Sequence, residues 1–558
     1  MKQAIVLNND NVVQIGWAYD KPIPGCLGFA IYRTNTVTNE RVALPAWVGF
    51  KEETQPWQVR TTAEWPVQKF NWRDTTVKLH EQYQYEIVPV TGTPGHLEEM
   101  KEETLYTAPI LVNPRCGPYT AAFNRGILAN QAIGPRGEPD FGSLLDQVED
   151  VNSPLRAKLA GNVPKLLTAL LNRARRENGQ CYIALYELND PQMIELLKQC
   201  PFAHVILANA GPNDQVNAVA RRELKTAGID VIDRMLPDGH LGHNKFMVYV
   251  DSKGKPQSVL TGSTNWSTTG LCTQSNNAII IDSPDLANAF MDYWSRLKDD
   301  KEQSFFFRRT NSYARPAPDI ASEVWFAPNT GAQNKPSDAS MPADIFDVSR
   351  LIREAKQAIF FLAFQPGDPN VLEEAAKAQG ENPGLFVRGA VTNQDTANGY
   401  IDAVHLYHGK VTPNAIVVAN PEDQVDRWQK ELTKANPQGY SIIHDKIIVI
   451  DPLSDNCTVI TGSHNLGYRA SYNNDENLLI IRGNKALAAA FTVHVMDVYD
   501  HYRWRNEMGK TGQDVWHALE RNDSWQSKYF ENGIINDPEL KFWFGEAPQI
   551  SQPLSEIS

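Results

Sequence analysis

Two copies of one short motif occur in this chain, about two hundred residues apart. The first is Gly242-His243-Asn244-Lys245 followed by Gly262-Ser263-Thr264-Asn265, and the second is Ile443-His444-Asp445-Lys446 followed by Gly462-Ser463-His464-Asn465. In each copy an H-x-K pair runs into a strand-like segment, and G-S-x-N follows about eighteen residues later. A repeat at this scale predicts two similar lobes. Because polar residues are what repeat, we expect each lobe to supply half of one active site, and an enzyme is the leading interpretation.

The bulk composition limits the class of protein. A chain of 558 residues is too long for one core, so two to four domains are expected. Hydrophobic residues make up 42% and charged residues 21%, which is typical of soluble globular proteins. The longest apolar runs have the length of strands, and residues 1–10 lack the apolar stretch of a signal peptide. These missing signals favour a cytoplasmic protein, while export without a cleaved peptide stays open.

No cofactor and no metal are expected. The six cysteines lack the spacing of a zinc site or a disulfide framework and are typical of reduced thiols. The sequence also has no carboxylate cluster suited to Mg²⁺ and no Cys/His set suited to Zn²⁺. The net charge of −13 argues mildly against a general affinity for nucleic acid, although an acidic body is compatible with a basic cleft.

The first 112 residues differ from the rest of the chain. Segments 12–17, 29–33 and 83–90 are alternating or β-rich and are separated by turn residues. This region resembles a fibronectin type III sandwich. The resemblance implies that Trp17 is the core tryptophan, that Tyr32 lies on the third strand and that Tyr83 is the tyrosine corner. A generic β-sandwich or barrel stays open as the alternative. Such modules usually recognise or position a partner.

From residue 113 onward β and α patterns alternate, as in an α/β sandwich. The order helix, strand, Asp-Pro pair and helix occurs twice, over 166–200 and again from 348, which supports a duplication beyond the motifs themselves. Residues 327–343, rich in Pro, Asn, Gly and Ser, are predicted to be a linker or loop. We predict a β-sandwich (1–112), a first lobe (113–322), a second lobe (323–505) and an aromatic-rich C-terminal extension (506–558).

The doubled motif resembles that of the phospholipase D superfamily, in which H-x-K-x4-D is followed by G-S-x-N and, eleven residues later, by Glu. The second copy matches at every position, namely His444, Lys446, Asp451, Ser463, Asn465 and Glu476. The first copy departs twice, because Asp251 comes one residue late and Asn276 stands where Glu is expected. The resemblance covers about residues 115–505 and implies an α/β fold of two duplicated α/β/α lobes that form one active site.

The residue types also suit phosphodiester chemistry without reference to the family. Such a reaction needs a nucleophile, an acid for the leaving oxygen and cations around the phosphoryl oxygens. The predicted catalytic residues are His243, Lys245, His444 and Lys446, and the predicted phosphate-binding residues are Ser263, Asn265, Ser463 and Asn465. Alternate side chains of a strand share a face, so each H-x-K pair points into one cleft. These donors surround a phosphate without a metal.

The two departures suggest how the histidines divide the work. A carboxylate next to an imidazole favours its protonated form more than an amide does. We therefore expect Glu476 to support His444 as general acid, and Asn276 to leave His243 neutral as the nucleophile that becomes phosphohistidine. The family resemblance likewise implies a first-motif nucleophile, and tyrosyl-DNA phosphodiesterases are similar in lacking the first Glu. Asp251 and Asp451 are expected to support the site and the fold from behind.

The substrate stays open. Two motifs on one chain resemble phospholipase D enzymes, and the acidic charge favours a phospholipid over nucleic acid, with possible peripheral membrane contact. The main alternative is a nuclease or other nucleic-acid phosphodiesterase, and a third is a non-catalytic binding protein. Hydrolysis and phosphatidyl transfer both begin from the same phosphohistidine. One chain suffices for catalysis, and the N-terminal domain is expected to bind an unidentified partner.

Overall fold

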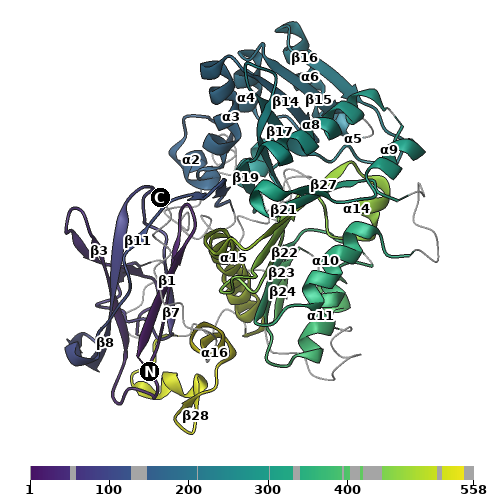
Figure 1. Ribbon diagram of the computed structural model, residues 1–558. Helices are drawn as coiled ribbons and strands as arrows, with labels where there is room; N and C mark the ends of the chain where they lie inside the picture. The colour runs from purple at the N-terminus through teal and green to yellow at the C-terminus, as the bar shows by residue number, and fades with distance from the viewer. Residues whose placement is uncertain are drawn as a thin grey trace. The chain divides into compact units, whose positions relative to one another are not determined.

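A computed structural model describes most of the chain (Figure 1). The described residues are 2–50, 58–126, 147–209, 212–300, 302–330, 340–367, 369–392, 395–401, 415–418, 443–511 and 518–545. Asp368, Trp516 and most of the predicted linker lie outside them. The chain divides into two compact units, one formed by residues 1–114 and 510–558 and the other by residues 115–509. Among the described helices, none combines the length and the apolar character that crossing a membrane requires.

The larger unit contains two eight-stranded mixed sheets with the same strand order. The first sheet runs β12 (Arg115–Cys116), β13 (Tyr119–Phe123), β19 (Asn277–Asp282), β18 (Pro256–Gly262), β17 (Lys245–Val250), β14 (Gln180–Leu185), β15 (Ala203–Ala208) and β16 (Asp230–Arg234). The second runs β20 (Arg315–Ala317), β21 (Ser322–Ala327), β27 (Glu476–Arg482), β26 (Thr458–Gly462), β25 (Lys446–Ile450), β22 (Ala358–Ala363), β23 (Phe386–Val391) and β24 (Ile416–Val418). The identical order confirms the predicted duplication of α/β lobes.

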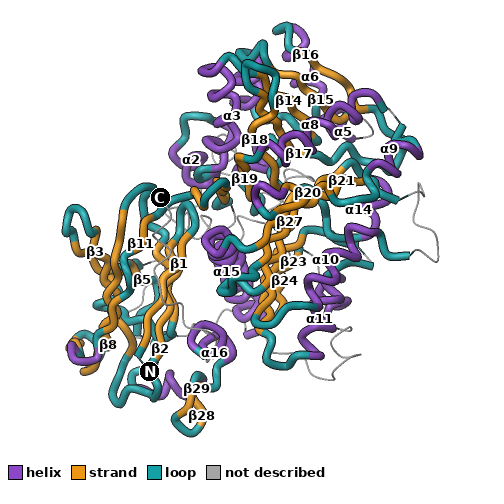
Figure 2. Tube along the Cα trace, in the orientation of Figure 1, coloured by secondary structure: helices purple, strands orange, loops and turns teal. Residues whose placement is uncertain are grey.

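Helices cover both faces of each sheet. In the first lobe they are α2 (Pro154–Ala160), α3 (Val163–Glu177), α4 (Pro191–Lys198), α5 (Pro212–Val216), α6 (Ala218–Thr226), α7 (Thr268–Cys272), α8 (Pro284–Asp299) and α9 (Phe305–Thr310). In the second they are α10 (Ala343–Arg353), α11 (Leu372–Glu381), α14 (Tyr468–Asn473) and α15 (Lys485–Thr511). Figure 2 shows α10 and α11 on one face of the second sheet and α15 on the other. Each lobe is therefore an α/β/α sandwich.

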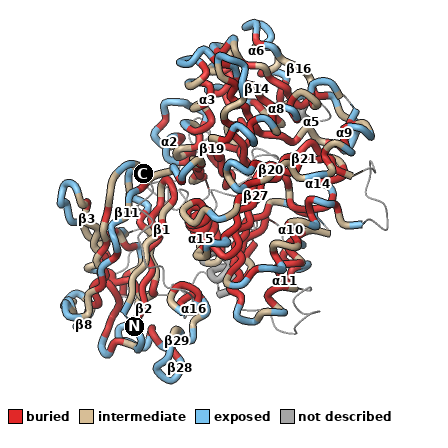
Figure 3. The backbone as a smooth tube through the Cα atoms, viewed as in Figure 1, coloured by how far each residue is buried: buried red, intermediate tan, exposed pale blue. Residues whose placement is uncertain are grey.

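The central strands of both sheets are buried on both faces (Figure 3). Their sequences are continuous apolar runs, as expected for strands between two helical layers. One core cluster lies under α3, α4 and α6, and the corresponding cluster of the second lobe lies under α10 and α11. Asp190 caps the N-terminus of α4 through its Oδ1 atom, and its Oδ2 accepts from the buried Arg156 at 2.7 Å. The packed sheets give the strand ends a rigid support.

The smaller unit is built around two antiparallel sheets. One contains β1 (Gln3–Asn8), β2 (Val13–Ala18) and β7 (Asn71–Asp74), and the other contains β3 (Gly28–Asn35), β4 (Arg41–Ala43), β8 (Gln82–Thr93), β9 (His96–Glu99), β10 (Leu105–Tyr106) and β11 (Ile110–Leu111). Short pairs are formed by β5 (Pro45–Ala46) with β6 (Arg60–Thr61) and by β28 (Phe530–Glu531) with β29 (Ile534–Ile535). This confirms an all-β N-terminal region, while the fibronectin type III label stays a prediction.

The core of the smaller unit combines both ends of the chain. Trp17 is fully buried and meets Phe29 edge to face at 5.1 Å between ring centroids. Trp525 packs against Phe29, and its indole nitrogen donates to the carbonyl of Cys26 at 2.9 Å. The Tyr83 hydroxyl accepts from the backbone N–H of Lys78 at 3.2 Å. The described part of the C-terminal extension, which includes α16 (Pro538–Phe544), thus completes this hydrophobic core.

Candidate active site

Both H-x-K pairs lie where two strands of each sheet reach the same edge. Lys245 is the first residue of β17 and pairs with Leu185 at the end of β14, while Lys446 begins β25 and pairs with Ala363 at the end of β22. The neighbouring strands β18 and β26 end at this edge in Gly262 and Gly462. The sequence pattern therefore folds into two equivalent polar strand ends, one in each lobe.

The glycine of each G-S-x-N motif permits a close backbone approach. Gly262 has a φ of +136° and Gly462 a φ of +138°, which L side chains rarely adopt. A Cβ atom would lie 2.5 Å from the carbonyl oxygen of Asn277 at Gly262, and 2.4 Å from that of Asn477 at Gly462. Any side chain there would push the serine and asparagine that follow away from the strand end.

Each motif histidine contacts a residue of the other lobe. His243 Nδ1 lies 2.9 Å from Glu476 Oε2, and His444 Nδ1 lies 2.9 Å from Asn276 Oδ1. The expectation that Glu476 supports His444 and that Asn276 supports His243 is therefore wrong. The physical reason is that the lobes exchange these outer residues across their interface.

Backbone contacts between the lobes produce this exchange. Ser275 and Ile443 form an isolated parallel bridge, in which the N–H of His444 donates to the carbonyl of Ser275 at 3.1 Å. On the equivalent side, the N–H of Asp475 donates to the carbonyl of Leu241 at 2.8 Å. The residues next in sequence to these contacts are the exchanged partners Asn276 and Glu476. Docking of the lobes therefore builds the site.

A buried ion pair joins the lobes beside the site. Arg234 Nε donates to Asp475 Oδ2 at 2.8 Å, and its Nη2 donates to Oδ1 at 3.2 Å. Both side chains are almost fully buried. The second bond makes the contact bidentate and fixes its direction. Asp475 precedes Glu476, so this pair holds the carboxylate that supports His243.

The hydrogen-bond network assigns the tautomer of each ring. The Nδ2 of Asn276 donates to the carbonyl of Gly270 at 2.9 Å, which leaves Oδ1 facing the imidazole of His444. The carboxylate of Glu476 can only accept when ionised. Both Nδ1 atoms therefore carry the proton, and the Nε2 of His243 and of His444 is left for the reaction.

Burial keeps both imidazoles neutral. It lowers the pKa of His243 to about 4 although the neighbouring Glu476 raises it. The pKa of His444 also lies well below its usual value, because burial acts together with Lys446, Lys245 and His243. Burial alone would raise the pKa of Glu476, but His243 holds it below its usual value. Of the two rings, His243 is the one with a carboxylate partner, so positive charge on its ring is stabilised by Glu476.

The two lysines share a matching environment. Lys245 Nζ donates to the carbonyl of His243 at 2.8 Å and lies 4.9 Å from the centre of the Tyr186 ring. Lys446 Nζ donates to the carbonyl of His444 and lies 5.1 Å from the centre of the Phe364 ring. Burial lowers the pKa of Lys245 to about 8 and that of Lys446 well below its ordinary value. The aromatic rings lie within cation–π distance of both amines, and burial removes water from them, so an anion that binds here interacts strongly with their positive charge.

The serines and asparagines of G-S-x-N divide between two tasks. The Ser263 hydroxyl donates to Asn276 Oδ1 at 2.8 Å, and Ser463 Oγ accepts from the N–H of Asn477 at 3.0 Å. The first bond holds the Asn276 side chain, and the second holds the backbone next to Glu476. Asn265 is buried and Asn465 is half-buried, and the Oδ1 atom of each is buried without a hydrogen-bond partner among the described residues. Direct contact of these four residues with a phosphate stays a prediction.

Asp251 and Asp451 lie at the far ends of their strands. β17 alone spans about 17 Å between Lys245 and Val250. Asp251 Oδ1 accepts from the N–H of Lys253 and of Lys255, each at 2.9 Å, and so holds the following turn. Asp451 accepts from three successive backbone N–H groups of residues 356–358. Both residues were expected to support the fold and, from behind, the site: their hydrogen bonds fit the first role, and the second is corrected because both residues lie at the far strand ends.

Sequence reasoning missed three side chains at this edge. Tyr186 and Phe364 follow β14 and β22 at equivalent positions, and their rings lie 4.7 Å from His243 and 4.9 Å from His444. Glu187 comes next and accepts from Asn265 Nδ2 at 2.9 Å. The signal was present as a polar or aromatic residue directly after an apolar strand in both repeats. The motif itself does not reach these positions.

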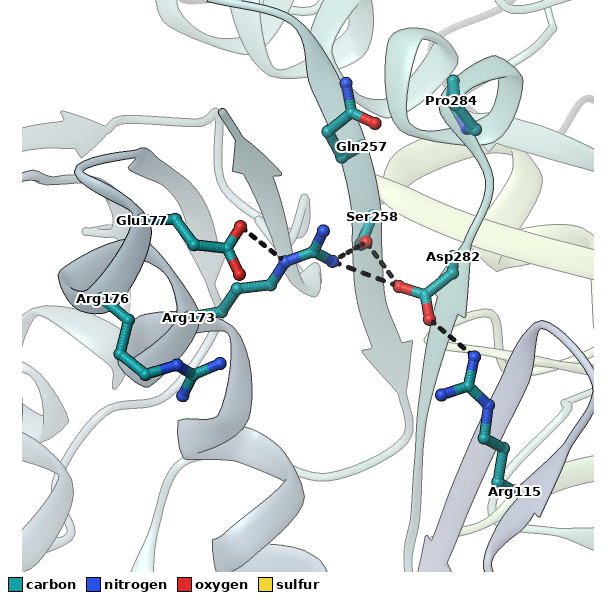
Figure 4. A pocket seen from close by; sticks show the side chains of 8 residues that line it. All are labelled: Arg115, Arg173, Arg176, Glu177, Gln257, Ser258, Asp282 and Pro284. Atoms are coloured by element: carbon teal, nitrogen blue, oxygen red, sulfur yellow. Dashed lines mark hydrogen bonds and ion pairs between the residues drawn. The ribbon is translucent and has the colours of Figure 1, made fainter. Parts of the chain in front are cut away.

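A pocket of about 400 Å³ lies at the opposite end of the first sheet (Figure 4). Arg173, at its centre, donates to Ser258 Oγ at 2.9 Å and pairs with Glu177 and Asp282. β18 begins beside this pocket and ends at the histidines, so the two places are separated by the length of the strand. Its central arginine is paired with carboxylates, and neither H-x-K motif lines the pocket.

The fold and this edge define a class in which two α/β/α lobes join their polar strand ends. The family model described as "Cardiolipin synthase, PLD-like domain" matches residues 167–298 and 349–496, which is half of the chain and covers both lobes. The chain therefore belongs to this phospholipase D-like family of phosphodiesterases. No curated protein matches the chain closely enough to be counted as a relative.

Solved structures are similar at low identity. Polyphosphate kinase from Porphyromonas gingivalis is 13% identical over 57% of this chain, which spans only 42% of the kinase, with a TM-score of 0.36. Phosphatidylserine synthase from Haemophilus influenzae is 13% identical over 65% of this chain and 90% of its own, with a TM-score of 0.40. Yeast tyrosyl-DNA phosphodiesterase is 10% identical over 57% of this chain and 88% of its own, with a TM-score of 0.32.

The lowered lysine pKa values predict proton uptake when an anion binds. An anion stabilises the protonated lysines, so the pKa of Lys245 rises from about 8. At pH 8 the Lys245 amine, half protonated without the anion, therefore takes up protons when the anion binds. Affinity for inorganic phosphate is therefore expected to fall as the pH rises through this range. Calorimetric titration at pH 8 in two buffers of different ionisation enthalpy measures the uptake. Release of protons on binding would contradict this assignment, and so would an unchanged proton uptake in Lys245→Met.

Proposed function

We propose that the protein cleaves or transfers phosphodiesters through a phosphohistidine on His243. The Nε2 of His243 attacks phosphorus as the bond to the leaving oxygen breaks, and the Nε2–H of His444 gives that oxygen its proton. Water or an alcohol then attacks phosphorus and loses its proton to His444 Nε2, and an O–P bond forms as the N–P bond breaks and releases His243. The contact of His243 Nδ1 with Glu476 carries the proposal, because this carboxylate stabilises the cationic phosphoimidazole.

The remaining site residues fit the charge that develops in this reaction. Lys245 and Lys446 supply positive charge for the phosphoryl oxygens, and the anionic substrate raises the pKa of both lysines and of His444. His444 then holds the proton that the leaving oxygen needs. Both half-sites lie on one chain, which supports catalysis by a single copy.

We further propose a phospholipid as substrate. The net charge of −13 disfavours a long nucleic-acid polyanion, and the matched family is described by a lipid-synthesising activity. The alternative is a nucleic-acid phosphodiesterase. It is favoured by the unequal partners Glu476 and Asn276, because tyrosyl-DNA phosphodiesterases are similar in lacking the first Glu. Hydrolysis and transfer differ only in the second attacking group.

The test compares substrates under metal-free conditions. Purified protein in EDTA is offered phosphatidylglycerol vesicles, with and without glycerol as acceptor, and single-stranded DNA with a 3′-tyrosyl group. We expect turnover of the lipid, lost in the His243→Ala/His444→Ala variant. A higher kcat/KM on DNA would replace the lipid proposal by the alternative, and product with glycerol would identify a transferase. Turnover that survives the double substitution would overturn the two-histidine mechanism.

A further inference from the structure

A carboxylate lies inside the cationic site, where a phosphodiester alone gives it no role. Glu187 follows Tyr186 at the end of β14 and is half-buried. It lies close enough to Lys245 and Lys446 to interact with both charges. Burial raises its pKa, and Lys245 opposes this most strongly. A fixed negative charge here weakens the attraction of the lysines for an anionic substrate.

The equivalent position of the other lobe carries no charge. Strand pairing makes Leu185 equivalent to Ala363, because each is the partner of the lysine in its own H-x-K motif. Two residues later, Glu187 therefore corresponds to Gln365, which is exposed and uncharged. The lobes keep the same histidine, lysine, serine and asparagine but differ here. The carboxylate is thus specific to the side of the nucleophile His243.

A second acceptor lies next to this carboxylate. Asn265 is 3% exposed, and its Nδ2 donates to Glu187 Oε2 at 2.9 Å. The Oδ1 atom of the same amide is buried and has no hydrogen-bond partner among the described residues. Asn465 also has a buried Oδ1 without a partner among the described residues. A buried acceptor without a partner is costly, and the non-bridging oxygens of a phosphodiester are acceptors themselves.

We propose that Glu187 and Asn265 form a subsite for a hydrogen-bond donor, an ammonium or hydroxyl group, on the alcohol part of the phosphodiester. The inference rests on the proposed function, since the subsite adjoins the phosphate position between the lysines. A donor there satisfies Asn265 Oδ1 and faces the Glu187 carboxylate. An ammonium group also offsets its charge, so the pair selects headgroups that carry a donor close to phosphorus.

The test keeps the leaving group constant and changes the donor. Four p-nitrophenyl diesters differ in their second alcohol. Methanol offers no donor and choline a cation without N–H, whereas ethanolamine offers an ammonium group and glycerol offers hydroxyls. Wild type is compared with Glu187→Gln and with Gln365→Ala as the matched control in the other lobe. In Glu187→Gln we expect kcat/KM on the ethanolamine or glycerol diester to fall about tenfold to a hundredfold. The methyl diester, which has no donor, should lose no activity in Glu187→Gln, because removing the carboxylate strengthens the attraction of the lysines for the substrate, and the control should follow wild type.

Three results would overturn the subsite. They are an equal loss on all four diesters, no loss on any, or a loss in Gln365→Ala that matches Glu187→Gln. If turnover survives in His243→Ala, the proposed function itself fails, which separates the two failures. Binding supplies a measurement that needs no turnover: phosphoethanolamine should bind wild type about tenfold more tightly than methyl phosphate, and Glu187→Gln should remove that difference. Equal affinity in wild type would contradict the inference.

Discussion

Replacing His243 with alanine is expected to lower kcat/KM on a phosphodiester by about 10⁴-fold or more, because it removes the atom that forms the covalent bond. His444, Lys245 and Glu476 remain in this variant, so any residual rate reports the electrostatic part of catalysis. The measurement is steady-state hydrolysis of bis(p-nitrophenyl) phosphate in EDTA.

The control for this experiment is His204→Ala. His204 lies on β15, pairs with Asp230 at the surface and lies away from the strand ends that carry the site. It should retain wild-type activity, and the thermal unfolding midpoint of each variant shows whether the fold is intact. If folded His243→Ala keeps more than a tenth of the wild-type activity, the nucleophile must be another residue.

His444→Asn is expected to trap the covalent intermediate. A p-nitrophenolate leaves without an acid, so His243 is still phosphorylated, but no base remains to activate the water of the second step. We expect a burst close to one equivalent of p-nitrophenolate followed by very slow turnover. Mass spectrometry under neutral conditions should find the added group on the peptide that contains His243. A diester with an alkyl leaving group should give no burst, because that oxygen needs its proton.

The His243→Ala/His444→Asn variant is the control for this adduct and should carry none. An adduct found on His444 in a His243→Asn variant, with none in His444→Asn, would reverse the two roles. It would also mean that the amide of Asn276 supports the nucleophile and that Glu476 supports the acid.

Much of the site could be predicted because its members are close in sequence. His243 and Lys245 are two residues apart and precede one strand, and Ser263 and Asn265 follow the adjoining strand of the same hairpin-like pair. Local spacing and strand periodicity therefore place them at one edge. The continuous apolar strands between helices were visible for the same reason, and the duplicated sheet order confirms what the repeat predicted.

The errors came from residues whose neighbours lie far along the chain. Asn276 and Glu476 were assigned to the histidines of their own repeats, since nothing local indicates an exchange. Asp451 is part of the motif, yet its hydrogen bonds hold the backbone before β22, almost a hundred residues earlier. The motif does not predict Glu187, because this residue precedes the first motif and lies at the site only through the pairing of β14 with β17.

The sequence by itself determined which chemical groups are available, namely two imidazoles, two amines and their serine and asparagine neighbours, because each set is held by one short stretch of backbone. Only the tertiary structure decided which outer residue supports which imidazole. The contact of His243 with Glu476 joins residues 233 positions apart, and that of His444 with Asn276 joins residues 168 apart. Such pairs form only when two folded lobes dock, and no local preference of the chain encodes them.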